Sequence, residues 1–413
     1  MESKTIGAIL IITGTCVGAG ILALPLSTAG LGFIPTVISL GITWIISVVT
    51  ALLLVEVLAK LKIKNINFDT MCSKTLGRVG QVVCMVAYLI LMYAVSSAYL
   101  SGGTSMLSAL LKQGGVTLPY WVSSLVFAIV LGAIVCFGHR SVDLANRTLL
   151  SIKGISFIVL VAILMPDVTH ANLFDFKHTL PYFWYAVPVL FFAFGFQVIV
   201  PSMYNYLEQD IKQLKIAIVV GSLIPFLLYS LWLCVTLGIL PRFGHTSYSS
   251  FLHTHSSGDV GALFTMLGSQ GSLRWSHKVM DVFTNVAVTT SFLTVTMALK
   301  DYLSDIFKLD SQTKCGNGKG ALLTYLPPLA LVLFAPTLFQ VALDYAAASL
   351  AVVLVFLPVA MAVSIRRQNK LADASGAFKV SGGVPLLTIL VIFGIVLLSL
   401  SFMASWNMLP VLH

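Results

Sequence analysis

The fold is decided by the stretch Thr13-Gly14-Thr15-Cys16-Val17-Gly18-Ala19-Gly20-Ile21, which is followed by Pro25. It lies inside an apolar run long enough to cross a bilayer, yet glycine and proline both weaken a helix. Non-helical backbone at membrane depth is tolerated only where it lines a cavity or is buried in protein. The stretch therefore predicts a membrane helix that is interrupted near its middle.

The composition of the whole chain is that of a membrane protein. Of its 413 residues, 58% are hydrophobic and only 9% are charged, with a mean hydropathy of +0.97. A soluble domain carries about 25% charged residues, so lipid must be the solvent for much of this chain. The net charge of +9 could suggest a nucleic-acid partner in a soluble protein. Here the charges lie in short loops, where the positive-inside rule explains them, and we expect no nucleic-acid partner.

The chain contains eleven apolar segments with the length of membrane spans. They run over 5–28, 33–59, 81–111, 118–137, 148–166, 184–206, 215–240, 278–300, 321–338, 340–364 and 384–406. No stretch alternates like a strand over a useful length, and helices satisfy their own backbone groups in lipid. We therefore expect an all-α polytopic membrane protein with about 11 transmembrane helices, forming one domain over residues 1–413.

A second interruption falls in the sixth span, at Phe194-Gly195-Phe196-Gln197-Val198-Ile199-Val200-Pro201-Ser202. Broken helices at equivalent positions of two halves are typical of transporters built from inverted repeats around a central site. The sequence thus predicts a five-plus-five inverted repeat over 5–166 and 184–364, with helices 1 and 6 broken and 384–406 as an extra helix. The alternative for the first break is close helix packing, since Gly14 and Gly18 also have GxxxG spacing.

The distribution of basic residues predicts the orientation. With the N-terminus inside, the Lys and Arg residues assigned to the outer side are only Lys112, Lys177, Arg242, Arg274 and Lys278, out of 24 in the chain. An odd number of spans then places the C-terminus outside. We expect a cytoplasmic N-terminus and a periplasmic C-terminus.

Motifs along nearly the whole chain resemble those of the hydroxy and aromatic amino acid permease family. They are Thr15-x-x-Gly18-Ala19-Gly20-x-Leu22-x-Leu24-Pro25, Leu53-Leu54-Val55-Glu56, Tyr99-Leu100-Ser101-Gly102, Val142-Asp143-Leu144-x-Asn146-Arg147, Phe194-Gly195-Phe196, Val200-Pro201-Ser202, Ser291-Phe292-Leu293, Asp301-Tyr302-Leu303-x-Asp305-x-Phe307, Leu326-Pro327-Pro328 and Gly382-Gly383-x-Pro385. Its tyrosine-specific members look most similar, followed by the tryptophan permeases. The chain differs from the usual family pattern at Gln197, where His is common, at Val198 and Ile199, where small residues are common, and at Asp344, where Gly is common.

The resemblance implies the amino acid–polyamine–organocation fold, proton symport of an amino acid, a bacterial inner-membrane location, no cofactor and no catalytic chemistry. The chain shows no HExxH or GxSxG motif and no cluster of carboxylates that would favour an enzyme. It shows no repeated filter that would favour a channel. The rival functions are a serine or threonine permease, a tryptophan or phenylalanine permease and a sodium-coupled carrier. Lipid is the surrounding medium, and the oligomeric state stays open.

A transported amino acid needs partners for its carboxylate, its ammonium and its side chain. We assign the carboxylate to the backbone amides of Gly18, Ala19 and Gly20, because a half-helix N-terminus carries partial positive charge. The carbonyls of Thr15 and Phe194 are candidates for the ammonium. The candidates for the ring pocket, for each aromatic of which core or lipid packing is the alternative, are Tyr93, Phe194, Phe196 and Gln197. The Gln197 amide could bond a phenol or indole, or instead bond the unwound backbone.

Lys153 is the most informative charge in the sequence. It lies six residues beyond Arg147, hence roughly 9 Å deeper in the membrane if helical. A lysine ammonium in hydrocarbon is costly and is easier to deprotonate than one in water. The resemblance puts Lys153 where sodium sits in sodium-coupled members of the fold, with Thr289, Thr290 and Ser291 as neighbours. The alternative is that Lys153 extends to the cytoplasmic surface.

Three further features are weaker candidates for functional sites. Glu56 precedes Lys60 by one turn, which favours a surface ion pair, with a proton relay as the alternative. Asp344 could gate the outer mouth or cap the tenth span, and the cap is the interpretation that we favour. The expected outer loop 241–277 holds the histidines His245, His253, His255 and His277. Imidazoles in a solvated loop are weak evidence for zinc, and we expect no metal.

Overall fold

The computed structural model describes residues 3–64, 66–136, 139–175, 177, 179–254, 260–273, 275–309, 313–335, 339–368, 378–406 and 408–412, and every regular element in them is a helix. The α-helices are α1 (Ser3–Cys16), α2 (Ala19–Thr28), α3 (Phe33–Leu61), α4 (Phe68–Gln113), α5 (Tyr120–Cys136), α6 (His139–Leu164), α7 (His170–Leu173), α8 (Leu180–Phe192), α9 (Val200–Tyr206), α10 (Ile211–Ile239), α11 (Tyr248–Thr254), α12 (Val260–Gln270), α13 (Ser276–Phe307), α14 (Lys314–Phe334), α15 (Phe339–Leu350), α16 (Leu357–Gln368) and α17 (Gly383–Ser405). Short 3₁₀ segments are η1 (Met165–Asp167) and η2 (Gly195–Ile199), and a π-helical segment is η3 (Ala351–Phe356). The predicted all-α fold is confirmed.

The helices carry the surface expected of a protein in lipid. Along α17, Ile389, Ile392 and Ile395 recur on one face and are 60%, 56% and 54% exposed. Among the described residues, eight helices are long and apolar enough to cross a membrane, or nine if α1 and α2 form one bent span. The segments 118–137 and 321–338 coincide with α5 and α14, which are not among these nine. The chain is therefore a multi-pass membrane protein, and the count of eleven spans stays a prediction.

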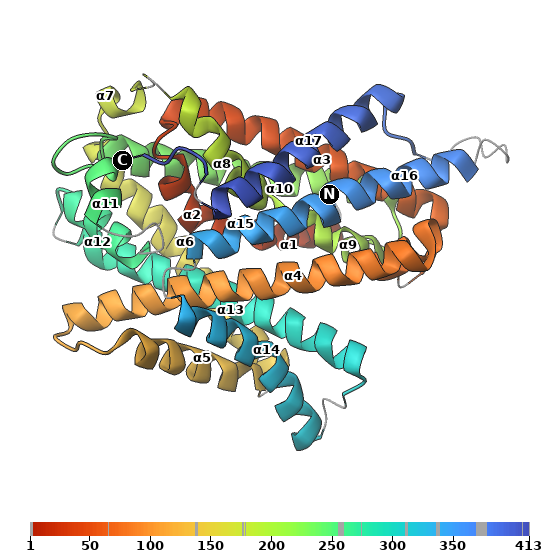
Figure 1. The fold of residues 1–413 in the computed structure, drawn as a ribbon, viewed down its shortest axis with the longest axis horizontal. Coiled ribbons are helices and arrows are strands. Elements are labelled where there is room, and N and C mark those ends of the chain that lie inside the picture. Colours follow the sequence, from red (N-terminus) through yellow and green to blue (C-terminus); the bar gives the residue numbers. More distant parts are fainter. Residues whose placement is uncertain are drawn as a thin grey trace.

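The long helices run side by side along the longest axis of the molecule (Figure 1). Helix α13 packs most extensively against α6 and α4, α15 against α4 and α17, and α1 against α10. We call α1 with α2 span 1, and α8 with η2 and α9 span 6. Helix α8 in turn packs against α2, α3, α15 and α17, so both broken spans lie within the bundle.

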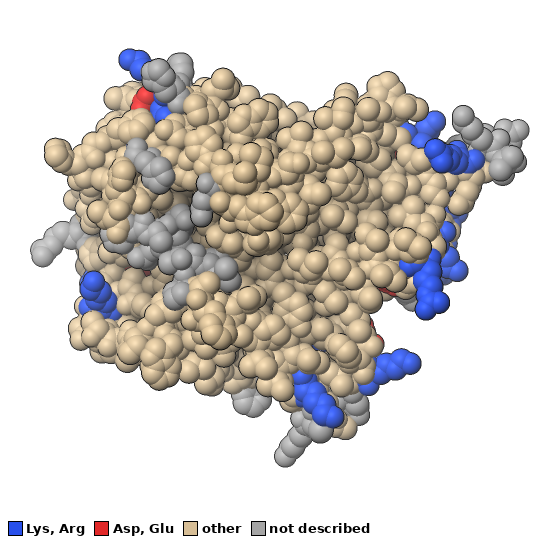
Figure 2. Space-filling view, in the orientation of Figure 1, with Lys and Arg blue, Asp and Glu red and all other residues tan. Residues whose placement is uncertain are grey.

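The two ends of the bundle differ. The right-hand end in Figure 1 holds the end of α3, the beginning of α4 and the end of α16, and Figure 2 shows Lys and Arg gathered there. We call it the basic end; its residues include Lys60, Lys62, Lys64, Arg366 and Arg367. The other end, where α7, α11, α12 and the C-terminus lie, is the lid end. The predicted loop 241–277 is thus partly helical, and His255 lies outside the described residues. The described part holds no group of three potential metal ligands.

Helix α4 begins before the span predicted at 81–111 because it has a bent leg at the basic end. Asn67 caps it by accepting a hydrogen bond from the amide of Thr70 at 2.7 Å. The bend is at Gly77, whose φ of 72° favours glycine. The leg Phe68–Leu76 brings Asp69 against Gln81, whose amide donates to the carboxylate at 2.7 Å.

Candidate functional site

Span 1 is interrupted at Val17 and Gly18, as the sequence predicts. Helix α1 ends at Cys16, α2 begins at Ala19, and the two halves are bent by 46°. The Gly18 amide donates to the Cys16 carbonyl at 2.7 Å, so it is already occupied. The first amides of α2, those of Ala19 and Gly20, have no carbonyl within their own helix. They remain the candidates for an anionic group.

Span 6 is interrupted over a longer stretch. Helix α8 ends at Phe192, a 3₁₀ segment covers Gly195–Ile199, and α9 begins at Val200 with a proline near its start. Proline is accommodated there because the first amides of a helix lack helical acceptors. The second predicted break is therefore present, directly beside Ala193 and Phe194.

A tyrosine from α10 joins the two breaks. The buried hydroxyl of Tyr229 lies within hydrogen-bond distance of the Cys16 carbonyl, at the end of α1, and of the Ala193 carbonyl, just after α8, the latter at 3.1 Å. Both carbonyls belong to C-terminal half-helix ends, whose carbonyls lack amide partners within the helix. The ring of Phe194 meets that of Tyr229 edge-on, with centroids 5.6 Å apart. The Tyr229 hydroxyl thus bonds one backbone carbonyl at each of the two helix breaks.

Spans 1 and 6 also touch directly through a glycine. A Cβ added to Gly20 would lie 2.9 Å from the Ala193 Cα and 3.1 Å from its Cβ. Only a residue without a side chain allows the backbones to approach so closely. Gly20 therefore sets the distance between the two broken spans.

Lys153 is buried and reaches the break in span 1 instead of the surface of the molecule. Its side chain is 5% exposed, and its Nζ donates to the Val17 carbonyl at 2.7 Å. Helix α6, which carries it, packs along α13. The ammonium thus replaces a helical amide as the donor to a carbonyl that the break leaves open.

Two further side chains meet span 1 at Gly18. A Cβ there would lie 2.6 Å from the Tyr99 hydroxyl of α4 and 3.2 Å from the Ser291 Oγ of α13. Ser291 was a predicted neighbour, whereas Tyr99 was not assigned to the site. Its signal in the sequence was the Tyr99–Gly102 motif. Thr290, one residue before Ser291, donates to the Ala287 carbonyl of its own helix at 3.0 Å, and Thr289 is half-buried.

The other predicted substrate residues do not all face the break. Thr15 is exposed, and its hydroxyl donates back to the Ile11 carbonyl at 2.8 Å. The Tyr93 hydroxyl donates to the Leu323 carbonyl of α14 at 2.9 Å, which turns it toward that helix. Phe196 is fully buried within span 6.

Gln197 is held by α3 and keeps one open acceptor. Its amide nitrogen donates to the Ser47 carbonyl at 3.3 Å and to the Thr50 hydroxyl at 3.2 Å. Its Oε1 is buried and has no hydrogen-bond partner among the described residues. A buried acceptor left open costs free energy, so a ligand hydroxyl near this atom would be favoured.

Glu56 forms an ion pair with a distant arginine, Arg366 of α16, and not with Lys60. The pair is bidentate, with Nε–Oε1 and Nη2–Oε2 distances of 2.8 and 2.7 Å. The amide of Val380 adds a third hydrogen bond to Oε2 at 2.9 Å. The carboxylate is fully buried and accepts on both oxygens. This geometry ties α3, α16 and the segment before α17 together at the basic end.

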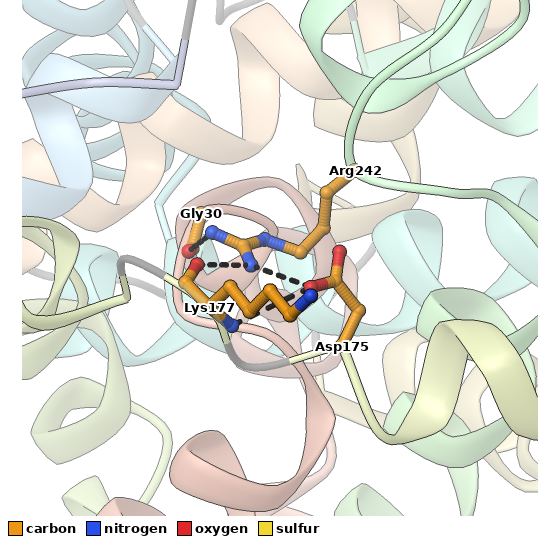
Figure 3. A network of polar contacts seen from close by, with 4 residues as sticks. All are labelled: Gly30, Asp175, Lys177 and Arg242. Atoms are coloured by element: carbon orange, nitrogen blue, oxygen red, sulfur yellow. Dashed lines mark hydrogen bonds and ion pairs between the residues drawn. The ribbon is translucent and has the colours of Figure 1, made fainter.

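The lid end is closed by a network around Arg242 (Figure 3). Its guanidinium donates to the Gly30 carbonyl at 2.6 Å and the Lys177 carbonyl at 2.9 Å, and lies 3.4 Å from the Asp175 carboxylate. Burial lowers the pKa of Arg242, whereas Asp175 raises it. The network joins the segments that follow α2, α7 and α10, and so holds these helices together at this end.

An aromatic layer lies beneath this network. Trp232 of α10 is surrounded by Phe283 of α13, Phe264 of α12 and Phe157 of α6, with ring centroids 5.3, 6.0 and 6.2 Å away. Phe157 follows Lys153 by one turn toward the lid end. The layer therefore separates the lid end from the region of Lys153.

The basic end is hollowed instead. A pocket of about 190 Å³ is lined by residues of α4, span 6 and α13, among them Asp69, Tyr88, Val198, Ser202 and Tyr302. The rings of Tyr88 and Tyr302 meet edge-on at 4.8 Å. Val198 belongs to the break in span 6, so the pocket extends from that break toward the basic end. At the lid end the described residues are held together by the Arg242 network and the aromatic layer, whereas at the basic end they line a pocket.

The chain matches known proteins over nearly its full length. Residues 1–401 match the model of the tryptophan/tyrosine permease family. Tyrosine-specific transport system 1 of Haemophilus influenzae is 33% identical over 410 residues, which cover 99% of both chains. Tyrosine-specific transport system 2 of the same organism is 32% identical over 417 residues, with 100% of this chain and 99% of the relative covered. A tryptophan-specific transport protein of that organism is 31% identical over 401 residues, covering 94% and 93%. The matched region includes both breaks and Lys153.

Proposed function

Because the chain belongs to the tryptophan/tyrosine permease family, we propose that it is a secondary transporter that takes up an aromatic amino acid, tyrosine above all, together with protons. It works in the bacterial inner membrane, with the basic end and the N-terminus in the cytoplasm and the C-terminus in the periplasm. Its two halves form a five-plus-five inverted repeat around the breaks, and α17 is the extra helix. It is a carrier and not an enzyme.

The observation that carries the choice of coupling ion is the hydrogen bond from Lys153 to the Val17 carbonyl. A cation at this place satisfies a carbonyl that the break exposes, and it holds α6 against span 1. A sodium ion beside the lysine ammonium would be repelled, so the two cannot share the position. Loss of the proton from Lys153 weakens this bond, because a neutral amine is a poorer donor than an ammonium, and so loosens the hold of α6 on span 1, which couples a proton to a conformational change. Glu56, bound on both oxygens, supports a structural role at the basic end better than a proton relay.

The substrate lies between the breaks. The first amides of α2, those of Ala19 and Gly20, receive its carboxylate, and the carbonyls of Thr15 and Phe194 receive its ammonium. The pocket at the basic end, with Tyr88 and Tyr302, is the path by which it leaves toward the cytoplasm. The open Gln197 Oε1 accepts the phenol hydroxyl of tyrosine.

Competition identifies the substrate class. In proteoliposomes with an inward pH gradient, excess tyrosine, phenylalanine or tryptophan should block uptake of labelled tyrosine, whereas serine and threonine should leave it unchanged, because an aromatic ring fills an apolar pocket that a short polar side chain does not. A sodium gradient in place of the pH gradient should give no accumulation. Inhibition by serine alone, or accumulation driven by sodium, would refute the proposal.

Gln197→Leu tests recognition of the phenol group. The variant should lower the preference for tyrosine over phenylalanine by about tenfold, since a site that bonds a hydroxyl discriminates strongly against its absence. The measurement is the ratio of inhibition constants of the two amino acids. Gln81→Leu, at a glutamine that bonds Asp69 in the leg region of α4, is the matched control and should keep the wild-type ratio. An unchanged ratio in Gln197→Leu would remove this residue from the site.

A further inference from the structure

Asp344 is a carboxyl group buried in the lid-end half of the bundle. It is 1% exposed and lies in the second turn of α15, which begins at Phe339. The interpretation of Asp344 as a helix cap is therefore wrong, since a cap precedes the first turn. The position needs another explanation.

The surroundings of Asp344 are polar but incompletely satisfied. Gln340 lies one turn before it, and Ser27 of α2 donates to the Gln340 Oε1 at 3.3 Å. The Asp344 Oδ1 and the Gln340 Nε2 are both buried without a hydrogen-bond partner among the described residues. Tyr185 of α8 lies close enough to interact electrostatically with Asp344. The cluster therefore joins α15 to the lid-end halves of spans 1 and 6.

No described cation balances this carboxyl. Helix α15 packs against α4, α17, α8 and η3, and α17 and η3 contain no titratable side chain. From α4, Tyr99 turns toward Gly18, and from α8, Tyr185 is the group that faces Asp344. On α15 itself, Tyr345 packs on Phe402 of α17. An ionised carboxylate in such a place loses the water that stabilises its charge, and no described residue donates a hydrogen bond to its Oδ1 in return.

We propose that Asp344 is a proton-binding site of the lid end: it is neutral in the closed conformation seen here, and the lid end opens when it ionises. Helices α2 and α8 flank the cluster in this conformation, since Ser27 bonds Gln340 and Tyr185 interacts electrostatically with Asp344. When they move away from α15, water reaches the carboxyl and stabilises its charge. Closing the lid end again then requires that Asp344 takes up one proton from the solution on that side.

The sign of the pH dependence follows from this linkage. The proton is bound in the closed state and released in the open state, so a rise in pH favours opening. One coupled proton changes the open-to-closed ratio by at most about tenfold per pH unit. The inference rests on the alternating access of the proposed function, but not on Lys153 or on the identity of the substrate.

Hydrogen exchange of the purified protein in nanodiscs tests the site. Peptides covering α2 and α15 are followed from pH 5.5 to 8.5, after correction for the intrinsic exchange rate. In the wild type, exchange in both helices should rise at least about threefold per pH unit over part of this range. In Asp344→Asn, whose amide stands in for the neutral acid, it should stay low at every pH. Asp281→Asn, at another carboxylate in the lid-end half of a span, should behave as the wild type.

The experiment uses neither substrate nor gradient, so its failure is distinct from a failure of the proposed transport. Wild-type exchange that does not change with pH in these two helices would overturn the inference. So would a full wild-type pH dependence in Asp344→Asn. If the asparagine variant does not fold, the wild-type titration alone decides.

Discussion

Lys153→Arg should abolish accumulation of tyrosine driven by a pH gradient, even though the positive charge is kept. Arginine does not lose its proton in the working range, so the bond to the Val17 carbonyl would persist through the cycle. Lys153→Gln should also fail to accumulate substrate, but should still exchange it across the membrane without a gradient. With one proton per substrate, a gradient of about one pH unit supports about tenfold accumulation in the wild type. In both variants the ratio of internal to external tyrosine should stay near one.

The measurement is uptake of labelled tyrosine at matched protein content, with and without the gradient. Lys300→Arg is the matched control, because Lys300 is also buried and bonds a carbonyl, that of Val135 at 3.4 Å, away from the break. It should accumulate substrate as the wild type does. Normal accumulation by Lys153→Arg would leave the proton without its proposed carrier.

Gly20→Ala should reduce the uptake rate by about ten- to a hundredfold. The new Cβ would lie 2.9 Å from the Ala193 Cα, and because that atom is backbone, spans 1 and 6 must separate to admit it. Overpacking of this kind costs about 1–3 kcal/mol. The sequence assigned the Gly20 amide to the substrate carboxylate, which a side chain at this position would approach. The structure places the collision between the two broken spans, before any substrate is bound.

The matched control for this prediction is Gly14→Ala. Gly14 lies in the same span, but a Cβ there meets no atom within 4 Å. It should keep full uptake, and alanine should stabilise the helix slightly. Binding and uptake are compared in both variants at equal amounts of protein in the membrane. Equal activity of the two variants would show that the close approach at Gly20 does not matter for transport.

Local chemistry decided which features could be predicted from the sequence. Glycine and proline mark a helix break wherever they occur in an apolar span, so both breaks were found, and the collinear motifs identified the family correctly. Lys153 was informative because a charge at membrane depth needs a nearby partner. That partner proved to be a backbone carbonyl in span 1.

Features that depend on tertiary contacts were missed. Glu56 was assigned to Lys60, its neighbour along the helix, whereas Arg366 lies 310 positions away in the chain. Tyr229 looks like any aromatic in an apolar span, and only the assembled bundle brings its hydroxyl to both breaks. Tyr93 and Tyr99 lie on the same helix, and their sequence spacing does not reveal which of them faces span 1.

The single hydroxyl of Tyr229 has a mechanical consequence. The hydroxyl has one hydrogen to donate, yet it lies within hydrogen-bond distance of both the Cys16 and the Ala193 carbonyls. These two carbonyls belong to the ends of two different half-helices. If one half-helix moved alone, the hydroxyl would have to release one of the two carbonyls. Release of the Ala193 carbonyl would leave a buried acceptor without this donor, at a cost of about 1–3 kcal/mol. Motion of both half-helices together with α10 avoids that penalty. We therefore expect spans 1 and 6 to start their movement in the same step instead of one after the other.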